Sequence, residues 1–405
     1  MSSKRAWFLV GFMWVAYFLN YSDRQVVFSI FPVLKSELHF TNTQLGLTSS
    51  IFLWVYALCS PIAGQIGDRV SKRMLVVLSL VLWSLATVLT GFSRSVLMLL
   101  SCRALIGITE SLFVPSAVAL TASAHSPAMR SRAVSLLNTA QLAGVAMGGW
   151  YGGFIAQRFH WRLAFYSLGL FGVFYAIPYS SFLRKTSEGV PEGIRTSGSK
   201  LAITALIKVR TFWVVSVVFP VFTFVLWLLY TWLPNFFYEK FSLSLAEAGF
   251  TATAYVQGAT FVGMLCGSGI SDYLYRRHKA ARFWMVNTGL LLLSPCVHWI
   301  GNTSSLYFAV VATVGFGFGC GLAFSSLQIC SFDVVPIDTR ASALGFLNLV
   351  GGFVSGFAAL LGGVWKESVG IQTLMTYAAL ACFLAGLLMI LGIKLYFQRD
   401  YDRVH

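Results

Sequence analysis

Two pairs of charged residues lie inside stretches of the chain that are otherwise built for lipid. Asp23 and Arg24 are adjacent in the first long apolar run, and Arg103 and Glu110 lie in the fourth. An ionisable side chain near the centre of a membrane span costs roughly 2.5 to 3.5 kcal/mol, so it indicates a functional site. Charges that snorkel from a helix end are the alternative for the first pair. Apolar sequence resumes after Arg24, which favours the functional interpretation.

These four charges are suited to binding an anion and carrying a proton. A carboxylate changes its proton affinity when its surroundings change, so Glu110 or Asp23 is a candidate proton carrier. A guanidinium stays charged and offers a planar, two-pronged donor, which makes Arg24 the better anchor for an anionic substrate. An anion on Arg24 would weaken its pairing with an internal acid, which could then be protonated. Static salt bridges are the competing interpretation, but buried pairs stabilise proteins weakly.

The spacing of the second pair predicts how the two charged segments face each other. Residues seven apart lie on one helix face, about 10.5 Å apart along the axis. Counted from the span boundaries, Arg103 lies at a depth near that of Arg24, and Glu110 lies nearer the midplane. We therefore expect both segments to line one polar cavity.

The composition defines the elements that must position these residues. The chain is 57% hydrophobic and 11% charged, with a mean hydropathy of +0.74, whereas soluble domains carry about 25% charged residues. We predict an all-α membrane protein with twelve transmembrane helices, each long enough to cross a bilayer. The predicted spans cover residues 7–33, 43–67, 74–93, 97–124, 133–157, 163–183, 211–237, 248–271, 283–301, 305–332, 341–364 and 371–393.

The net charge of +15 has a simple explanation in membrane topology. With the amino terminus inside, most of the 29 Lys and Arg residues fall on the cytoplasmic side, as the positive-inside rule requires. Both termini are then expected in the cytoplasm, no nucleic-acid partner is needed to explain the charge, and the short loops suit a bacterial inner membrane. The seven cysteines fall within predicted spans without metal-ligand spacing. No nucleotide-binding or hydrolase motif is present, so we expect no cofactor, no metal and no enzymatic activity.

A half-length repeat predicts the domain organisation. Both halves carry an Asp followed five residues later by an Arg, at Asp68 to Arg73 and Asp272 to Arg277. We predict a six-helix bundle over 1–183, a cytoplasmic linker over 184–210 and a second bundle over 211–405. Two similar halves imply a substrate site near the midplane and alternating access. Glycine-rich stretches at 144–153 and 315–321 are expected to pack helices closely.

The loop after the second span resembles the signature of the major facilitator superfamily. The motif G-x-x-x-D-R-x-G-x-R-R begins at Gly64, and this copy departs from it at Ser71 and Met74. Gly64 is expected to permit close helix approach, and charge contacts are expected to hold a cytoplasmic gate. The gate residues are Gly64, Asp68, Arg69, Arg73, Asp272 and Arg277.

Within the superfamily, the chain resembles the anion:cation symporter family, which takes up sugar acids and other organic anions with protons or sodium. The resemblance is carried by Tyr21-x-Asp23-Arg24, Tyr56, Arg103-x-x-x-Gly107-x-x-Glu110, Gln141, Trp161-Arg162, Trp232-Leu-Pro234 and Asn348. It implies proton coupling through Asp23, Arg103 and Glu110. It also implies substrate contacts from Tyr21, Arg24, Tyr56, Gln141 and Asn348.

Two alternatives remain open at this point. The same features resemble bacterial Spinster-like transporters, which are proposed to move lysolipids or other amphiphiles, and the second half has no charge within its spans to oppose a lipid tail. A membrane receptor without transport is the other. The predicted partners are a small anionic substrate such as an aldonate or hexuronate, protons and the bilayer, with a monomer as the default. Exact substrate, symport against antiport, and proton against sodium coupling are not decided by the sequence.

Overall fold

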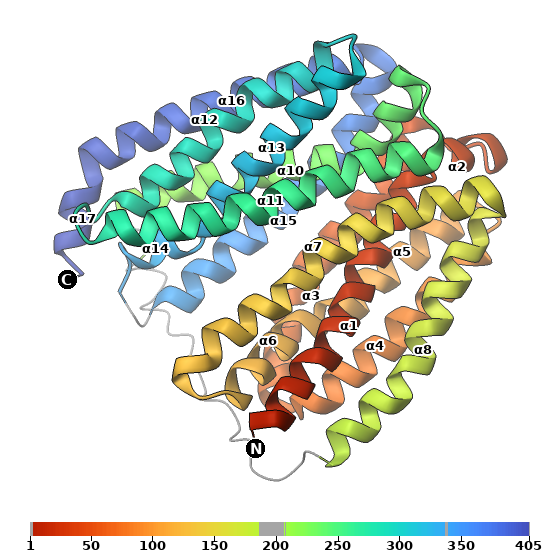
Figure 1. Cartoon of the computed structure of the whole chain (residues 1–405), viewed down its shortest axis with the longest axis horizontal. Coiled ribbons are helices and arrows are strands. Elements are labelled where there is room, and N and C mark those ends of the chain that lie inside the picture. The colour runs from red at the N-terminus through yellow and green to blue at the C-terminus, as the bar shows by residue number, and fades with distance from the viewer. Residues whose placement is uncertain (1–2, 186–205, 207, 337–338, 405) are drawn as a thin grey trace. The chain divides into compact units, whose positions relative to one another are not determined.

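The computed structural model describes residues 3–185, 206, 208–336 and 339–404, and the described chain is helical throughout, without strands (Figure 1). The predicted linker over 184–210 lies mostly outside these residues. The longer helices are α1 (Ser3–Ser29), α3 (Asn42–Arg69), α4 (Lys72–Gly91), α5 (Val96–Ser111), α6 (Phe113–Ala124), α7 (Pro127–Arg158), α8 (Trp161–Lys185), α10 (Arg210–Phe241), α11 (Leu245–Tyr275), α12 (Ala281–Asn302), α13 (Leu306–Leu327), α15 (Arg340–Ser368) and α16 (Ile371–Gly392). The shorter ones are α2 (Phe31–Glu37), α14 (Ile329–Phe332), the π-helix η2 (Ile393–Phe397) and α17 (Gln398–Asp402).

The helices confirm the prediction of an all-α membrane protein. Within the described chain, 9 helical segments are long and apolar enough to cross a membrane. Helices α1, α7 and α11 are not among them, although they have 27, 32 and 31 residues. Their polar and small residues lower the mean hydropathy. Hydropathy alone therefore does not identify these three helices as spans. Two of them hold sequences described above: α1 holds Asp23 and Arg24, and α7 holds the glycine-rich stretch 144–153.

Prolines account for two breaks that the predicted spans did not include. The first span was expected to continue to residue 33, but α1 ends at Ser29 and α2 begins at Phe31, with Pro32 in its first turn. The fourth was expected to be continuous, but it divides at Leu112, and Pro115 lies in the first turn of α6. Proline lacks an N–H and is tolerated in the first turn of a helix, so each proline favours a new helix start.

The chain forms two compact units. Unit 1 comprises Met1–Thr196 and Tyr230–Ala254, and unit 2 comprises Ser197–Leu229 and Tyr255–His405. Parts of α10 and α11 thus belong to unit 1, whereas the predicted bundle boundary assigned both helices wholly to the second half. The division into bundles over 1–183 and 211–405 stays a prediction.

A stripe of glycines packs α7 against α1. A β-carbon at Gly144, Gly148 or Gly152 would lie 2.5, 2.6 or 2.7 Å from the backbone oxygens of Phe18, Ser22 and Val26, respectively. The regular step of four residues keeps the stripe on one face of each helix. The expectation of close packing at 144–153 is confirmed, and the stripe fixes which face of α1 turns toward α7.

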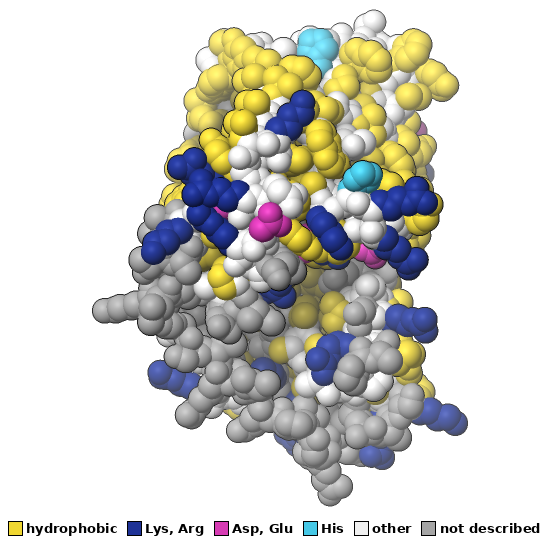
Figure 2. Space-filling view, turned by 90° about the vertical axis from the view of Figure 1, so that its left-hand side faces the viewer, with side chains coloured by type: hydrophobic (Ala, Val, Ile, Leu, Met, Phe, Trp, Pro, Cys, Tyr) yellow, Lys and Arg dark blue, Asp and Glu magenta, His cyan; other side chains and the backbone are white. Residues whose placement is uncertain are grey.

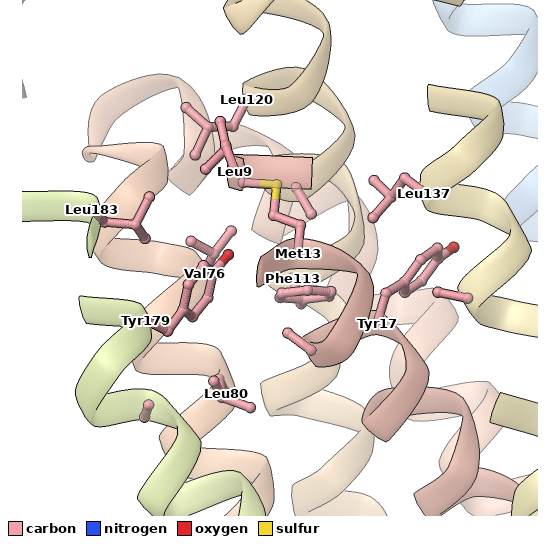
Figure 3. Close-up of a cluster of buried hydrophobic side chains, with 14 of the residues drawn as sticks. Leu9, Met13, Tyr17, Val76, Leu80, Phe113, Leu120, Leu137, Tyr179 and Leu183 are labelled. Atoms are coloured by element: carbon pink, nitrogen blue, oxygen red, sulfur yellow. The ribbon is translucent and has the colours of Figure 1, made fainter. Parts of the chain in front are cut away.

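A buried apolar cluster holds one end of unit 1 together (Figure 3). Side chains from α1, α4, α6, α7 and α8 meet there, and each labelled member is at most 4% exposed. Burial of a large apolar side chain in a packed interior contributes roughly 1.5 to 3 kcal/mol in water. The cluster anchors the first half of α1, next to the charged segment. Its labelled members are Leu9, Met13, Tyr17, Val76, Leu80, Phe113, Leu120, Leu137, Tyr179 and Leu183.

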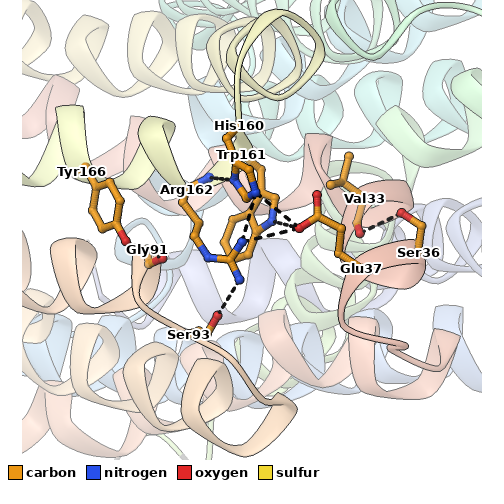
Figure 4. A network of polar contacts seen from close by, with 9 residues as sticks. All are labelled: Val33, Ser36, Glu37, Gly91, Ser93, His160, Trp161, Arg162 and Tyr166. Atoms are coloured by element: carbon orange, nitrogen blue, oxygen red, sulfur yellow. Dashed lines mark hydrogen bonds and ion pairs between the residues drawn. The ribbon is translucent and has the colours of Figure 1, made fainter.

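A polar network ties α2 to α8 at the other end of unit 1 (Figure 4). Glu37 Oε2 accepts hydrogen bonds from Trp161 Nε1 at 2.9 Å and from Arg162 Nη1 at 3.4 Å. Arg162 also donates from Nη2 to the carbonyl of Ser93 at 3.2 Å. Because one guanidinium joins α2, α8 and the turn after α4, this network fixes the end of the unit at which α1 stops.

In unit 2, glycines again bring helices together. Gly289 on α12 packs closely against Gly319 on α13. A β-carbon on Gly289 would lie 2.6 Å from the backbone oxygen of Gly319. On the opposite side of α13, a β-carbon on Gly317 or Gly321 would meet the backbone oxygen of Val256 or Thr260 on α11. The expectation of close packing at 315–321 is confirmed.

Candidate functional site

The charged side chains of α1 and α5 meet inside unit 1. Arg24 Nε donates a 2.6 Å hydrogen bond to Glu110 Oε2, and this contact is also an ion pair. Asp23, Arg24, Arg103 and Glu110 are 2%, 4%, 0% and 0% exposed. Charges this deeply buried need partners, because an isolated one is expensive to remove from water. The predicted convergence of the two charged segments is therefore present in the geometry.

Aromatic rings surround the Arg24 guanidinium. Its central carbon lies 4.5 Å from the ring centre of Tyr21 and 4.9 Å from the centres of both Phe52 and Tyr56. A cation over an aromatic face gains about 0.5 to 2 kcal/mol, more as water is excluded. The rings hold the guanidinium in place while leaving its edge for hydrogen bonding. Nη2 of Arg24 has no hydrogen-bond partner among the described residues.

Arg103 belongs to the same cluster but has a different partner. Its Nε donates to the carbonyl of Thr48 on α3 at 3.1 Å, and its guanidinium carbon lies 4.8 Å from the centre of the Phe52 ring. Phe52 therefore contacts both guanidinium groups. Nη1 and Nη2 of Arg103 are buried and have no hydrogen-bond partner within the described chain.

Asp23 is hydrogen-bonded to α4. Its Oδ2 accepts a 3.2 Å hydrogen bond from Thr87 Oγ1. Successive helical residues differ by 100°, and Ser22 faces α7 because its Oγ donates a hydrogen bond to the carbonyl of Gly144. Asp23 and Arg24 consequently turn to different neighbours. The two acids of the cluster occupy separate environments, one beside a hydroxyl and one beside a guanidinium.

One segment from the second half of the chain, part of α10, contacts this region within unit 1. Gln25, next to Arg24, donates from Nε2 to the carbonyl of Tyr230 at 3.1 Å. Thr231 Oγ1 donates to Ser49 Oγ, next to Thr48, at 3.1 Å. The part of α10 that lies in unit 1 thus contacts the immediate sequence neighbours of the charged cluster.

The other predicted substrate residues differ in how they relate to the cluster. Tyr21 and Tyr56 lie against Arg24, as described. Gln141 lies on α7 with a partly buried side chain, and Asn348 lies on α15 of unit 2 with an exposed side chain. The roles assigned to these residues stay predictions.

The residues of the gate motif make few contacts with one another. A β-carbon on Gly64 would meet no described atom within 4 Å, and the role of this glycine in close helix approach stays a prediction. Asp272 has Arg282 as its ion-pair partner at 3.8 Å, while Arg277 lies over the Tyr273 ring at 5.9 Å. Arg69 and Arg73 flank the α3–α4 turn, and the side chain of Asp68 lies outside the described part of the structure.

Three residues of the cluster were missed by reasoning from sequence. Phe52 and Thr48 share α3 with Tyr56, and Thr87 lies on α4. A phenylalanine or threonine in a span carries no charge signal, and a backbone carbonyl carries none at all. The one available signal was spacing, since Phe52 and Tyr56 are one helical turn apart on a common face.

Comparison with known proteins identifies the family of the chain. The model of the Major Facilitator Superfamily matches residues 13–359. The chain belongs to this superfamily. It is therefore a multi-pass membrane protein and a secondary transporter of a small substrate, not an enzyme.

Relatives and solved structures agree with this assignment. The chain is 26% identical to a hexuronate transporter of Bacillus subtilis over 379 residues, covering 89% of this chain and 87% of the relative. It is 31% identical to a probable sulfoacetate transporter of Cupriavidus necator over 321 residues, 75% of this chain and 72% of the relative. A crystal structure of a bacterial homologue of the human lysosomal transporter Spinster, inward-facing and occupied, matches with a TM-score of 0.82 and 19% identity, covering 99% of each chain.

Proposed function

We propose that this protein is a proton-coupled symporter of a small organic anion, such as an aldonate or hexuronate, that works by alternating access. The buried ion pair between Arg24 and Glu110 carries the proposal. Relatives whose names specify hexuronate and sulfoacetate transport support an anionic substrate. We further propose a location in the bacterial plasma membrane with both termini in the cytoplasm, which the distribution of Lys and Arg supports.

The proposed mechanism follows from competition for one guanidinium. Arg24 holds Glu110 through Nε, and its Nη2, which lies among the surrounding aromatic side chains, has no hydrogen-bond partner in the described part of the chain. An incoming carboxylate would share or displace Glu110 on Arg24, and the released acid would take up a proton. Because the four buried charges sum to zero, anion and proton together leave the cluster neutral. A neutral cluster can pass through the closed intermediate at lower electrostatic cost.

Uptake into proteoliposomes tests this function directly. We expect gradient-driven accumulation of at least one labelled sugar acid by wild type, a loss of more than tenfold in Arg24→Ala, and uptake without dependence on the proton gradient in Glu110→Gln. Glu247→Gln, which removes an exposed carboxylate outside the cluster, is the matched control and should behave as wild type. If Glu110→Gln keeps both uptake and its dependence on pH, proton carriage by Glu110 is wrong.

The alternative function is transport of a lysolipid or another amphiphile in the manner proposed for Spinster-like proteins. The fold similarity to the Spinster homologue favours it, as does the lack of charged residues in the predicted spans of the second half. Thermal protection of purified protein separates the two functions. A small acid that raises the melting temperature supports the symporter, whereas protection by lysolipid alone supports the alternative.

A further inference from the structure

A cavity of about 600 Å³ opens at the end of unit 2 that holds α17. One wall is the turn between α11 and α12, and the other is the junction of α16, η2 and α17. Figure 2 shows this end of the chain, where Lys and Arg side chains gather among apolar ones. The lining residues used below are Arg277, Lys279, Trp284, Ile393 and Phe397.

The cavity is positively charged and has little counter-charge of its own. Arg277 and Lys279 are exposed, and neither forms an ion pair with a carboxylate of the described residues. Arg282, just beyond the cavity, differs because it is paired with Asp333 at 2.7 Å. The start of α12 adds to the positive potential, since no side chain caps it at Ala280 and helix N-termini favour anions. The chemistry of the turn therefore selects a negatively charged group.

The opposite wall is firmly held, so the cavity is a preformed one. Phe397 packs edge-on against Phe283 with ring centres 5.0 Å apart. Asp400 on α17 accepts hydrogen bonds from the backbone N and Oγ1 of Thr211, both at 2.8 Å. The π-helical turn η2, which ends at Phe397, widens the helix locally, and such turns are frequent at functional sites.

The apolar residues of the lining distinguish an amphiphile from a free anion. Trp284 is 39% exposed and lies beside the basic turn, with Ile393 and Phe397 facing it across the cavity. Tryptophan at a membrane surface contacts headgroup and acyl chain together. Basic pockets between transmembrane helices bind lipid headgroups by the same combination. We propose that this cavity binds an anionic phospholipid, with its phosphate at Arg277 and Lys279 and its acyl chain along Trp284 and Ile393.

Titration of short-chain phosphatidylglycerol into purified protein, followed by melting temperature, tests the proposal. We expect a saturable rise in wild type that phosphatidylcholine does not produce. In Arg277→Gln/Lys279→Gln the apparent affinity should fall about thirtyfold, given the usual contribution of a basic residue near an anionic lipid. The matched control is Arg276→Gln/Arg399→Gln, which removes the same charge from exposed residues that do not line the cavity.

Each other outcome overturns the proposal. An equal loss of affinity for phosphatidylglycerol in both double variants would show that the lipid responds to general surface charge and not to this cavity. An equal rise with inorganic phosphate or glycerol 3-phosphate would assign the cavity to a free phosphate. An unchanged melting temperature of wild type in phosphatidylglycerol would show that the cavity does not bind this lipid. Each of these experiments measures the binding of lipid or phosphate, so the results do not depend on which substrate the transporter carries.

Discussion

At the scale of single residues, Thr87 gives the sharpest prediction about proton coupling. Its hydroxyl donates to Asp23 at 3.2 Å, and a donor of this kind favours the ionised carboxylate. Thr87→Val keeps the shape but removes this donor, whose hydrogen bond contributes about 1 kcal/mol. With Asp23 as a proton carrier, the pH of half-maximal proton-driven uptake should therefore move away from that of wild type. The pH profile of uptake in proteoliposomes measures this shift.

Thr87→Ser is the conservative control, because it restores a hydroxyl and should return the profile to that of wild type. A profile in Thr87→Val that coincides with wild type would mean that Asp23 does not titrate during transport. Lower uptake at every pH without a shift would mean that Thr87 only packs α4 against α1.

How far these residues could be predicted depends on the signal that each one carries. Asp23, Arg24, Arg103 and Glu110 stand out because charge inside an apolar run is expensive, and they do converge in unit 1. Their pairing was not predictable, since it depends on the rotation of α1. That rotation is set by backbone approach at Gly144 and the glycines that follow it. The types of side chain in a sequence do not specify how closely two backbones approach, so they do not fix the rotation of a helix.

At the scale of elements, the packing of α1 on α7 predicts opposite effects for two similar substitutions. A β-carbon on Gly148 would lie 2.6 Å from the Ser22 oxygen, whereas one on Gly11 would meet nothing within 4 Å. Gly148→Ala should destabilise the protein by about 2 kcal/mol, because overpacking forces the backbones apart. Gly11→Ala should be neutral or slightly stabilising, because alanine favours helix. Melting curves in detergent test both. An unchanged melting temperature in Gly148→Ala would contradict the close contact.

The elements also show where hydropathy is an incomplete guide. Helices α1, α7 and α11 are long, but their polar residues and glycines keep them below the apolarity of the other spans. These residues serve interhelical contacts, as at Gly148 and at Thr253, whose Oγ1 donates to the carbonyl of Ala146 at 3.1 Å. A helix that faces other helices can exchange apolar surface for close packing. The overall succession of helices was predictable from the sequence. The breaks at Ile30 and Leu112 lie next to Pro32 and Pro115, which are sequence signals that the predicted spans did not take into account.

At the scale of the whole molecule, the charge distribution is unequal between two halves of similar sequence pattern. The four charges of the cluster, Asp23, Arg24, Arg103 and Glu110, all lie in the first half of the chain. Part of the second half packs beside them in unit 1 through Tyr230 and Thr231. This arrangement links the charged cluster to α10, which is expected to move in the proposed alternating access. We expect a rearrangement around Arg24 to displace Gln25, its neighbour in α1, and to alter the hydrogen bond from Gln25 to Tyr230.

Alternating access requires these contacts to separate once in each transport cycle. The oxygens of Ser49 and Thr231 lie 3.1 Å apart, which is close enough for cysteines at both positions to be joined by an oxidant. We expect Ser49→Cys/Thr231→Cys to lose more than nine-tenths of its uptake after oxidation and to regain it after reduction. Each single variant, which retains the native cysteines, should be unaffected by the same treatment. Uptake that persists in the fully crosslinked double variant would show that the two helices stay together throughout the cycle, and the link between the cluster and α10 would then have no part in transport.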